Sequence, residues 1–263
     1  MGILNITPDS FSDGGRHLDV ERAVDAGLRM VDAGADILDV GGESTRPGAE
    51  SVGADEELRR VLPVVDGLAR RTDALISIDT YKAVVASAAV ERGAAIINDI
   101  SGLQYDRALG GVAARTGTPL ILMHTRGRSR EMYERAVYDD VVGEVTAELG
   151  RAIDRATGAG VKREALVVDP GFGFAKAPAH SLTLLARLSA LAALDRPILS
   201  GPSRKSFLKL AIGERAPEDR EWGTAAAVTV SVLQGAHILR VHDVAAMVDV
   251  IRVADRALEL QPG

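Results

Sequence analysis

The sequence predicts an α/β protein of the (β/α)₈ TIM-barrel class, built as a single domain over residues 1–263. Short apolar runs rich in β-branched residues recur along the whole chain, and each leads into apolar positions at helical spacing. Eight such units fit into about 250 residues, the usual size of this barrel. Aromatic residues make up only 3% of the chain, so Ala, Val, Leu and Ile must fill the core. Those residue types are the ones that fill barrel interiors.

Each expected strand is a short apolar run that ends in polar or glycine residues. Runs with few polar breaks suit strands that are buried on both faces, and alternation with helices favours a parallel sheet. The expected strands are GILNIT (2–7), ILDVGG (37–42), LISIDT (75–80), AIINDI (95–100), PLILMHT (119–125), LVVDPG (166–171), PILSGPS (197–203) and HILRVHD (237–243).

The expected helices lie between these strands, and several end at a glycine, as helix C-termini commonly do. They cover 19–34, 54–70, 81–93, 106–116, 139–159, 180–194, 204–212 with 222–235, and 244–260. A doubly wound open sheet is the structural alternative. It usually carries a glycine-rich phosphate loop after its first strand, and NITPDSFSDGG is not that fingerprint.

The composition limits the classes of partner. A net charge of −6 argues against nucleic acid as the main partner. With no cysteine, the chain has no disulfide framework and no thiolate chemistry. The start, MGILNITPDSF, has no basic segment followed by an apolar run, and no stretch reaches the ~18 apolar residues of a membrane span. We expect a cytoplasmic protein that does not enter a membrane.

Polar side chains follow almost every expected strand. Active sites of these barrels lie at the C-terminal ends of the strands, so we expect such side chains to converge on one rim. They are Asn5, Asp39, Asp79, Asn98 with Asp99, His124, Asp169, Ser203 to Lys205, and Arg240 with His242 and Asp243. Residues at strand ends also cap helices, and Thr80 and Asp243 fit that role. Asp39 fits a structural role equally well.

Two segments near the end of the chain suit anions. SGPSRKSFL (200–208) sets basic and hydroxyl residues where a strand meets a helix, and RVHD (240–243) adds a guanidinium and an imidazole. Barrels often bind phosphate near these two loops; a solvated basic helix start is the alternative. Long Gly- and Pro-containing loops follow strands one, two and five, as binding loops and lids often do. Phe11 lies in the first of them, either anchored inward or packed over a substrate.

Seven motifs together resemble the dihydropteroate synthase family. They are NITPDSFSDGG (5–15), DVGGESTRPGA (39–49), SIDT (77–80), NDI (98–100), DPGFGF (169–174), SRKSF (203–207) and RVHD (240–243). The resemblance covers almost the whole chain, in order. It implies 6-hydroxymethyl-7,8-dihydropterin diphosphate and p-aminobenzoate as substrates, and 7,8-dihydropteroate and diphosphate as products. It also implies Mg²⁺ at the diphosphate, a homodimer, and sulfonamides as competitors of p-aminobenzoate.

The resemblance implies a pterin pocket made of Asp79, Asn98, Met123, Asp169, Lys205 and Arg240. Asp169 would accept from the two adjacent donors of the pterin, its 2-amino and N3–H groups, which a carboxylate matches bidentately. Asn98 can both donate to and accept from the ring edge. Met123 fits ordinary barrel core as well.

The remaining site residues implied by the resemblance divide by substrate group. Those for diphosphate are Asn5, Thr45, Arg46, Arg240 and His242, with Asn5 also on Mg²⁺, which uses few protein ligands. Those for p-aminobenzoate and the loops over it are Phe11, Thr45, Arg46, Pro47, Phe174 and Ser206. Ser206 is expected at a helix N-terminus that offsets the substrate carboxylate.

We interpret Asp79, Lys205, Arg240 and His242 as the catalytic residues of an SN1-like displacement at the pterin methylene. The motifs offer a clamp for a leaving group but no evident nucleophile. A pterin-dependent methyltransferase and a non-catalytic pterin-binding paralogue are the alternatives. The first should lack the diphosphate clamp, and the second should lose Asn5 or the loop residues Thr45 and Arg46.

Segment 222–235 reads as a helix that is apolar nearly all round. It fits core packing against the barrel, or the face of the homodimer that the resemblance implies. One departure from the family pattern concerns backbone geometry, because Ala175 stands where the family frequently has glycine.

Overall fold

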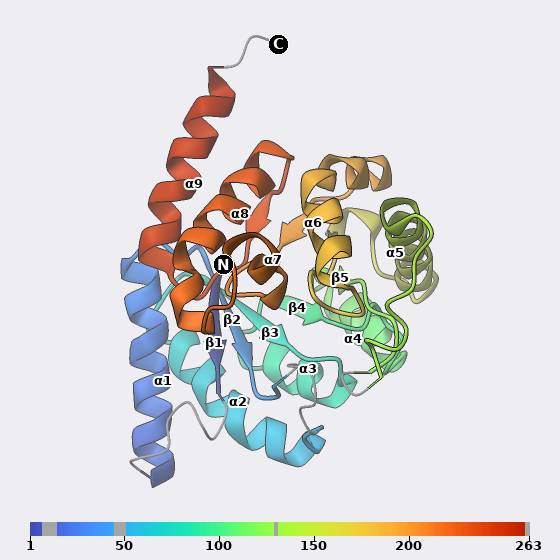
Figure 1. Ribbon diagram of the computed structural model, residues 1–263. Helices are drawn as coiled ribbons and strands as arrows, with labels where there is room; N and C mark the ends of the chain where they lie inside the picture. The colour runs from blue at the N-terminus through green and yellow to red at the C-terminus, as the bar shows by residue number, and fades with distance from the viewer. Residues whose placement is uncertain (7–14, 45–50, 129–130, 261–263) are drawn as a thin grey trace.

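The computed structural model describes residues 1–6, 15–44, 51–128 and 131–260, and within these ranges eight parallel strands form the centre of the molecule. Helices surround them, as Figure 1 shows. The strands are β1 (Gly2–Asn5), β2 (Ile37–Gly41), β3 (Leu75–Asp79), β4 (Ile96–Asp99), β5 (Leu120–Met123), β6 (Leu166–Asp169), β7 (Leu199–Ser200) and β8 (Ile238–Leu239). All eight lie inside the ranges that the sequence predicted.

The eight strands close into a ring. β1 to β6 pair in chain order, and β7 pairs with β8. The amide of Val168 donates to the carbonyl of Pro197 at 2.9 Å, which links β6 to β7. The amide of Ile3 donates to the carbonyl of Val241 at 2.9 Å, which links β8 back to β1. The predicted (β/α)₈ barrel is therefore confirmed, and an open doubly wound sheet is ruled out.

The long helices, apart from α6, follow the predicted segments to within a few residues. They are α1 (Gly15–Asp32), α2 (Ala54–Ala69), α3 (Ala83–Val90), α4 (Ala108–Thr116), α5 (Val141–Gly158), α6 (Pro178–Ala186), α8 (Glu221–Leu233) and α9 (Val244–Glu259). Periodicity located them because each lays one apolar stripe on the barrel. No helix in the described ranges has the length and apolar character needed to cross a membrane.

Two predicted helices were wrong in form. Segment 180–194 breaks at Arg187, whose φ of −123° and ψ of 28° are not helical, and continues as a 3₁₀ helix over Leu188–Leu194. Segment 204–212 is a 3₁₀ turn over Ser206–Leu208 followed by the four-residue α7 (Lys209–Ile212). Arg204 precedes that turn with a φ of +58°, which regular helix cannot accommodate.

Two apolar layers hold the barrel. The larger layer lies between strands and helices and includes Leu38, Ile78, Val65 and Leu109, all fully buried. The smaller layer fills the barrel interior. Its centre is Ile96, Ile121 and Leu199, surrounded by Met1, Ile37, Val167 and Ile238. Four of these, Ile37, Ile96, Val167 and Ile238, come from the even-numbered strands, and such alternation is how barrel interiors are layered.

Candidate active site

A cleft opens at the C-terminal ends of the strands. It receives side chains from β3 to β6, from β8, and from the segments after β6 and β7. Its lining residues are Asp79, Asn98, Ile100, Met123, Asp169, Gly171, Phe172, Phe174, Gly201, Lys205 and Arg240. Seven of these were predicted as site residues. The cleft thus gathers in one place residues that are up to 161 positions apart in the chain.

Arg240, which follows β8, is held by two carboxylates from other strands. Its Nε donates to Oδ2 of Asp39 at 2.6 Å, and its Nη2 donates to Oδ2 of Asp79 at 2.8 Å. Burial alone lowers the pKa of a guanidinium, but Asp39 and Asp79 outweigh it, so the pKa of Arg240 lies above its ordinary value. Arg240 is therefore a fixed positive charge at the floor of the cleft.

Burial shifts the pKa of Asp79 in the opposite direction to that of Arg240. Burial raises the pKa of its carboxyl to about 7, Arg240 opposes the rise, and Asp39 and Glu57 add to it. A carboxyl with a pKa near neutrality changes its charge in the physiological range. Such groups cluster at functional sites because they can hold or release a proton there.

Asp39 lies behind the cleft lining. It is fully buried, and its Oδ2 accepts both from Arg240 and from the amide Nδ2 of Asn98 at 3.1 Å. Because Nδ2 of Asn98 is occupied in this way, the orientation of the Asn98 amide is fixed. Of the two sequence interpretations of Asp39, the structural role is the one that the geometry favours.

Asp169 ends β6, and the turn that follows shapes the cleft. Its Oδ1 accepts from the amide of Gly171 at 2.7 Å. Burial raises the pKa of Asp169, while the Gly171 amide and Lys205 oppose the rise. Gly171 has a φ of +66°, and a Cβ there would stand 2.1 Å from the carbonyl oxygen of His124. Only glycine fits this turn, so glycine is required to place the Asp169 carboxyl in the cleft.

Lys205 and Phe174 meet across the cleft. The ammonium of Lys205 lies 4.2 Å from the centre of the Phe174 ring, within the range of a cation–π contact. Phe174 belongs to the turn after β6 and Lys205 to the segment after β7. The two residues therefore join neighbouring barrel segments at one end of the lining.

His242 and Asn5 are not among the residues that line the cleft. Oγ of Ser203 lies 3.0 Å from Nδ1 of His242 and also accepts from the His242 amide at 3.2 Å, which fixes the imidazole two residues after Arg240. Asn5 ends β1 and is paired in register with Gly41 of β2. The described residues contain no group of three His, Cys, Asp or Glu that could hold a metal ion.

Five further predicted site residues are not among the cleft-lining residues. Phe11, Thr45, Arg46 and Pro47 lie outside the described residues. Ser206 is exposed and begins a three-residue 3₁₀ helix. Ser206 thus lies at the start of a helical stretch, as expected, and this stretch is a 3₁₀ turn that runs directly into the four-residue α7.

Two strand-end residues expected at the rim point elsewhere. His124 is buried, and its Nε2 lies 3.0 Å from Glu148 on α5. The carboxylate of Asp99 accepts from the amides of Ser101 at 2.8 Å and Leu103 at 2.6 Å. Sequence reasoning missed Ile100, Gly171, Phe172 and Gly201 as lining residues. The glycines after β6 and β7 were the available signal, since close backbone approach often requires glycine.

The cleft combines hydrogen-bonding groups with charge. Asp169 and Asn98 offer an acceptor and an amide to the edge of a flat polar ring, and Met123 and Phe174 offer apolar contact. Arg240 and Lys205 supply positive charge, and Asp79 a titratable carboxyl. This arrangement suits a reaction in which an anionic group leaves and positive charge develops on a heterocycle.

Comparison with known proteins gives the same protein family that the sequence motifs resemble. A family model described as "Pterin binding enzyme" matches residues 1–242. Dihydropteroate synthase of Escherichia coli K12 is 47% identical over 258 residues, covering 98% of this chain and 91% of the relative. Yersinia pestis dihydropteroate synthase, solved with a sulfonamide drug, has a TM-score of 0.92 at 43% identity and covers 98% and 94%. The Xanthomonas albilineans enzyme, solved with 4-aminobenzoic acid, has a TM-score of 0.92 at 46% identity and covers 100% and 93%.

Gly171→Ala is expected to lower the free energy of unfolding by at least about 3 kcal/mol, because its Cβ collides with a backbone carbonyl. Gly117→Ala is the matched control. Gly117 caps α4 with a φ of +68°, and no atom lies within 4 Å of the position that a Cβ would take there. This control carries only the left-handed backbone cost of about 1–2 kcal/mol. Urea denaturation of both variants measures the difference, and equal losses would contradict the steric account.

Proposed function

The chain belongs to the dihydropteroate synthase family of pterin-binding enzymes, and from that premise we propose how its residues perform the reaction. The enzyme condenses 6-hydroxymethyl-7,8-dihydropterin diphosphate with p-aminobenzoate, giving 7,8-dihydropteroate and diphosphate. The observation that carries this proposal is the single cleft in which Asp79, Asn98, Asp169, Lys205 and Arg240 meet.

The pterin ring lies deepest in the proposed complex. The carboxylate of Asp169 accepts from the 2-amino and N3–H groups, a bidentate pair. Asn98, whose Nδ2 is held by Asp39 at 3.1 Å, presents its amide oxygen to the other ring edge. Lys205 donates on the O4 and N5 side, and Met123 packs against the ring face.

The diphosphate binds at the ends of β1 and β8. Arg240 and His242 supply positive charge and donors there, and the family resemblance adds Thr45 and Arg46 to the diphosphate residues. Asn5 is the residue that would hold Mg²⁺ at the diphosphate through its amide oxygen, since Mg²⁺ commonly uses few protein ligands. When bound, the ion offsets the negative charge that gathers on the leaving diphosphate.

The arylamine occupies the outer part of the cleft. Phe174 forms one wall beside Lys205, and the family resemblance adds Phe11, Pro47 and Ser206 as residues for the arylamine. A sulfonamide presents an arylamine of similar shape, so we propose that sulfonamides compete for this position. The sulfonamide drug in the Yersinia pestis structure is consistent with that proposal.

Chemistry begins with cleavage of the bond between the pterin methylene carbon and the bridging oxygen. Diphosphate departs with the electron pair, and the resulting cation is conjugated with the ring. The arylamine nitrogen then forms the new bond to carbon and transfers a proton to water. The ionised Asp79 carboxylate stabilises the positive charge of the pterin cation. The positive charge of Arg240 stabilises the departing diphosphate. The described residues that line the cleft include no cysteine or serine, which disfavours a covalent route through a thiol or hydroxyl.

Retention of Arg240, Lys205 and His242 disfavours a pterin-dependent methyltransferase, which has no diphosphate to hold. The presence of Asn5, Thr45 and Arg46 disfavours a non-catalytic paralogue. We place the reaction in the cytoplasm, because a diphosphate ester is too highly charged to cross a membrane unaided.

We propose a homodimer formed through α7, α8 and α9. One side of α8 packs in the core through Ala227, Val228 and Val232. The other side leaves Trp222 80% exposed, and neighbouring large apolar residues are exposed as well: Leu210, Val230, Leu233 and Val253. An exposed apolar surface of this kind is typical of an association face.

Turnover with the pterin diphosphate and labelled p-aminobenzoate is expected to yield labelled dihydropteroate, and removal of Mg²⁺ with a chelator is expected to abolish it. A pterin diphosphate substrate labelled at the ester oxygen, between the methylene carbon and phosphorus, tests the order of bond breaking. If a free cation forms, the label is expected to move into the neighbouring non-bridging phosphate oxygens even without p-aminobenzoate.

Absence of product with both substrates and Mg²⁺ present would refute the proposed function. Product formation without any scrambling would instead refute only the SN1-like order of steps. Complementation of a synthase-deficient strain separates the enzyme from a non-catalytic paralogue.

The pKa of Asp79 predicts an acid limb in the pH profile. The ionised form is the active one, so kcat/KM should fall as the pH drops below about 7. Asp79→Asn should lose about a hundredfold in kcat/KM and also lose this limb. Asp154→Asn, at an exposed position of α5, is the control and should keep both. An unchanged acid limb in Asp79→Asn would assign it to another group.

Trp222→Glu is expected to yield monomers, because it sets a charge in the apolar association face. Val84→Glu, on the 55% exposed side chain of α3, is the matched control and should remain dimeric. Sedimentation velocity at micromolar concentration distinguishes the two. A wild-type protein that sediments as a monomer would overturn the proposed dimer.

A further inference from the structure

Lys176 is a buried lysine just beyond the cleft, with 1% of its surface exposed. Its ammonium lies 2.9 Å from the carbonyl oxygen of Phe174 and 2.8 Å from Nδ1 of His124. The carbonyl oxygen of His124 is a third acceptor at 3.4 Å. A lysine has three N–H donors, so these acceptors can use all of them. Burying a lysine is unfavourable, and such a full set of acceptors offsets that cost.

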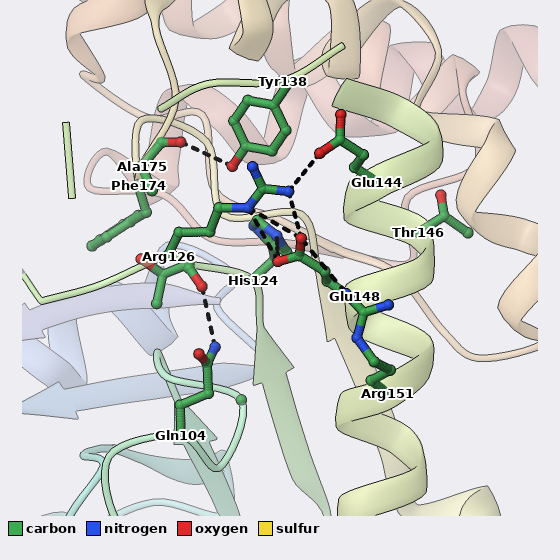
Figure 2. Close-up of polar contacts among 12 residues, drawn as sticks. Gln104, His124, Arg126, Tyr138, Glu144, Thr146, Glu148, Arg151, Phe174 and Ala175 are labelled. Atoms are coloured by element: carbon green, nitrogen blue, oxygen red, sulfur yellow. Dashed lines mark hydrogen bonds and ion pairs between the residues drawn. The ribbon is translucent and has the colours of Figure 1, made fainter. Parts of the chain in front are cut away.

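The far side of His124 connects this lysine to α5. Nε2 of His124 lies 3.0 Å from Glu148, and Arg126 pairs with the same carboxylate and with Glu144 at 2.7 Å. Figure 2 shows these groups gathered between the end of β5 and α5. Burial, with Lys176 nearby, lowers the pKa of His124 to about 4, so the imidazole is neutral. Its Nδ1 then accepts from Lys176 while Nε2–H donates to Glu148.

Charge on Lys176 is not needed for its two shorter contacts. Burial lowers the pKa of Lys176 to about 7, with Asp169 and Glu148 opposing the fall. The neutral amine still has two N–H groups, enough for the Phe174 carbonyl and for His124. The connection therefore persists across the physiological pH range.

The next residue is held from the same side. The hydroxyl of Tyr138 donates to the carbonyl of Ala175 at 2.9 Å, and the guanidinium of Arg126 lies 4.0 Å from the centre of the Tyr138 ring. Ala175 has a φ of +49°, uncommon for a residue with a Cβ. Two successive carbonyls, those of Phe174 and Ala175, are thus fixed against β5 and the segment before α5.

Fixing the two carbonyls directs the Phe174 side chain the other way. Figure 2 shows the Phe174 ring pointing away from the His124, Arg126 and Glu148 group. On that other side it meets Lys205 at 4.2 Å and lines the cleft. Asp169, by contrast, is placed by β6 and by the Gly171 amide, whereas the Lys176 ammonium bonds to His124 and Phe174 and reaches Asp169 only through charge.

We propose that Lys176 is a positioning residue for the arylamine half of the site, which sets the Phe174 ring by holding the Phe174 carbonyl to His124. This inference rests on the proposed function, because it takes Phe174 as a wall of the p-aminobenzoate position. It assigns to Lys176 an effect on the arylamine that is separate from pterin binding.

Lys176→Met tests the inference, because methionine keeps the unbranched stem and removes the donors. The KM for p-aminobenzoate should rise about tenfold, the loss expected for hydrogen bonds from a buried amine. The dissociation constant of a pterin, measured by calorimetry without p-aminobenzoate, should stay within about twofold. Lys162→Met makes the same chemical change at an exposed residue and should alter neither quantity.

A double-mutant cycle with Phe174→Ala shows whether the effect passes through the ring. In the Phe174→Ala background, Lys176→Met should no longer raise the KM for p-aminobenzoate. Additive effects would overturn the proposal. Equal losses of pterin and arylamine affinity would overturn it as well, since they indicate general damage to the turn.

Tyr138→Phe keeps the test decisive if Lys176→Met does not fold. It removes only the hydroxyl that holds the Ala175 carbonyl, and it should raise the KM for p-aminobenzoate about threefold at unchanged pterin affinity. An unchanged KM for p-aminobenzoate would contradict the inference. Wild-type protein that makes no dihydropteroate would refute the proposed function instead, so the two failures are distinguishable.

Discussion

The buried guanidinium of Arg240 is the constraint on which the site depends. A charge in the barrel mouth is tolerated only with opposite charges beside it, and Asp39 on β2 and Asp79 on β3 provide them. Because Asp39 also holds Asn98 on β4, one ion-pair group joins four strands around the ring. The same contacts that link these strands therefore orient the side chains of Arg240 and Asn98. They also shift the pKa of the Asp79 carboxyl.

Much of this arrangement follows from the sequence because barrel geometry is so regular. Parallel strands of one closed ring end at the same rim, so Asp79, Asn98, Asp169 and Arg240 had to approach one another once the eight strands were located. The strand positions were predicted from apolar periodicity and composition. Strands that are buried on both faces appear as short, nearly continuous apolar runs, so they are easy to recognise.

Side-chain direction could not be obtained in the same way. His124 directly follows β5 and Asp169 ends β6, yet His124 turns to Glu148 on α5 and to Lys176 and does not line the cleft. The helix predicted over 204–212 begins only at Ser206 and is partly 3₁₀, because Arg204 has a positive φ that composition does not reveal. Lys176 went unnoticed since burial of a lysine depends on acceptors supplied by distant residues.

The exposed indole on α8 has a practical consequence, because Trp222 is the single tryptophan of the chain. Fluorescence excited selectively at indole therefore originates from one place on the outer face, with 80% of that side chain open to water. Its emission maximum and its quenching by iodide respond to whatever covers α8. Loosening of the barrel interior can proceed with little change in that signal. Subunit contact and core melting can accordingly be followed as separate optical events in one sample.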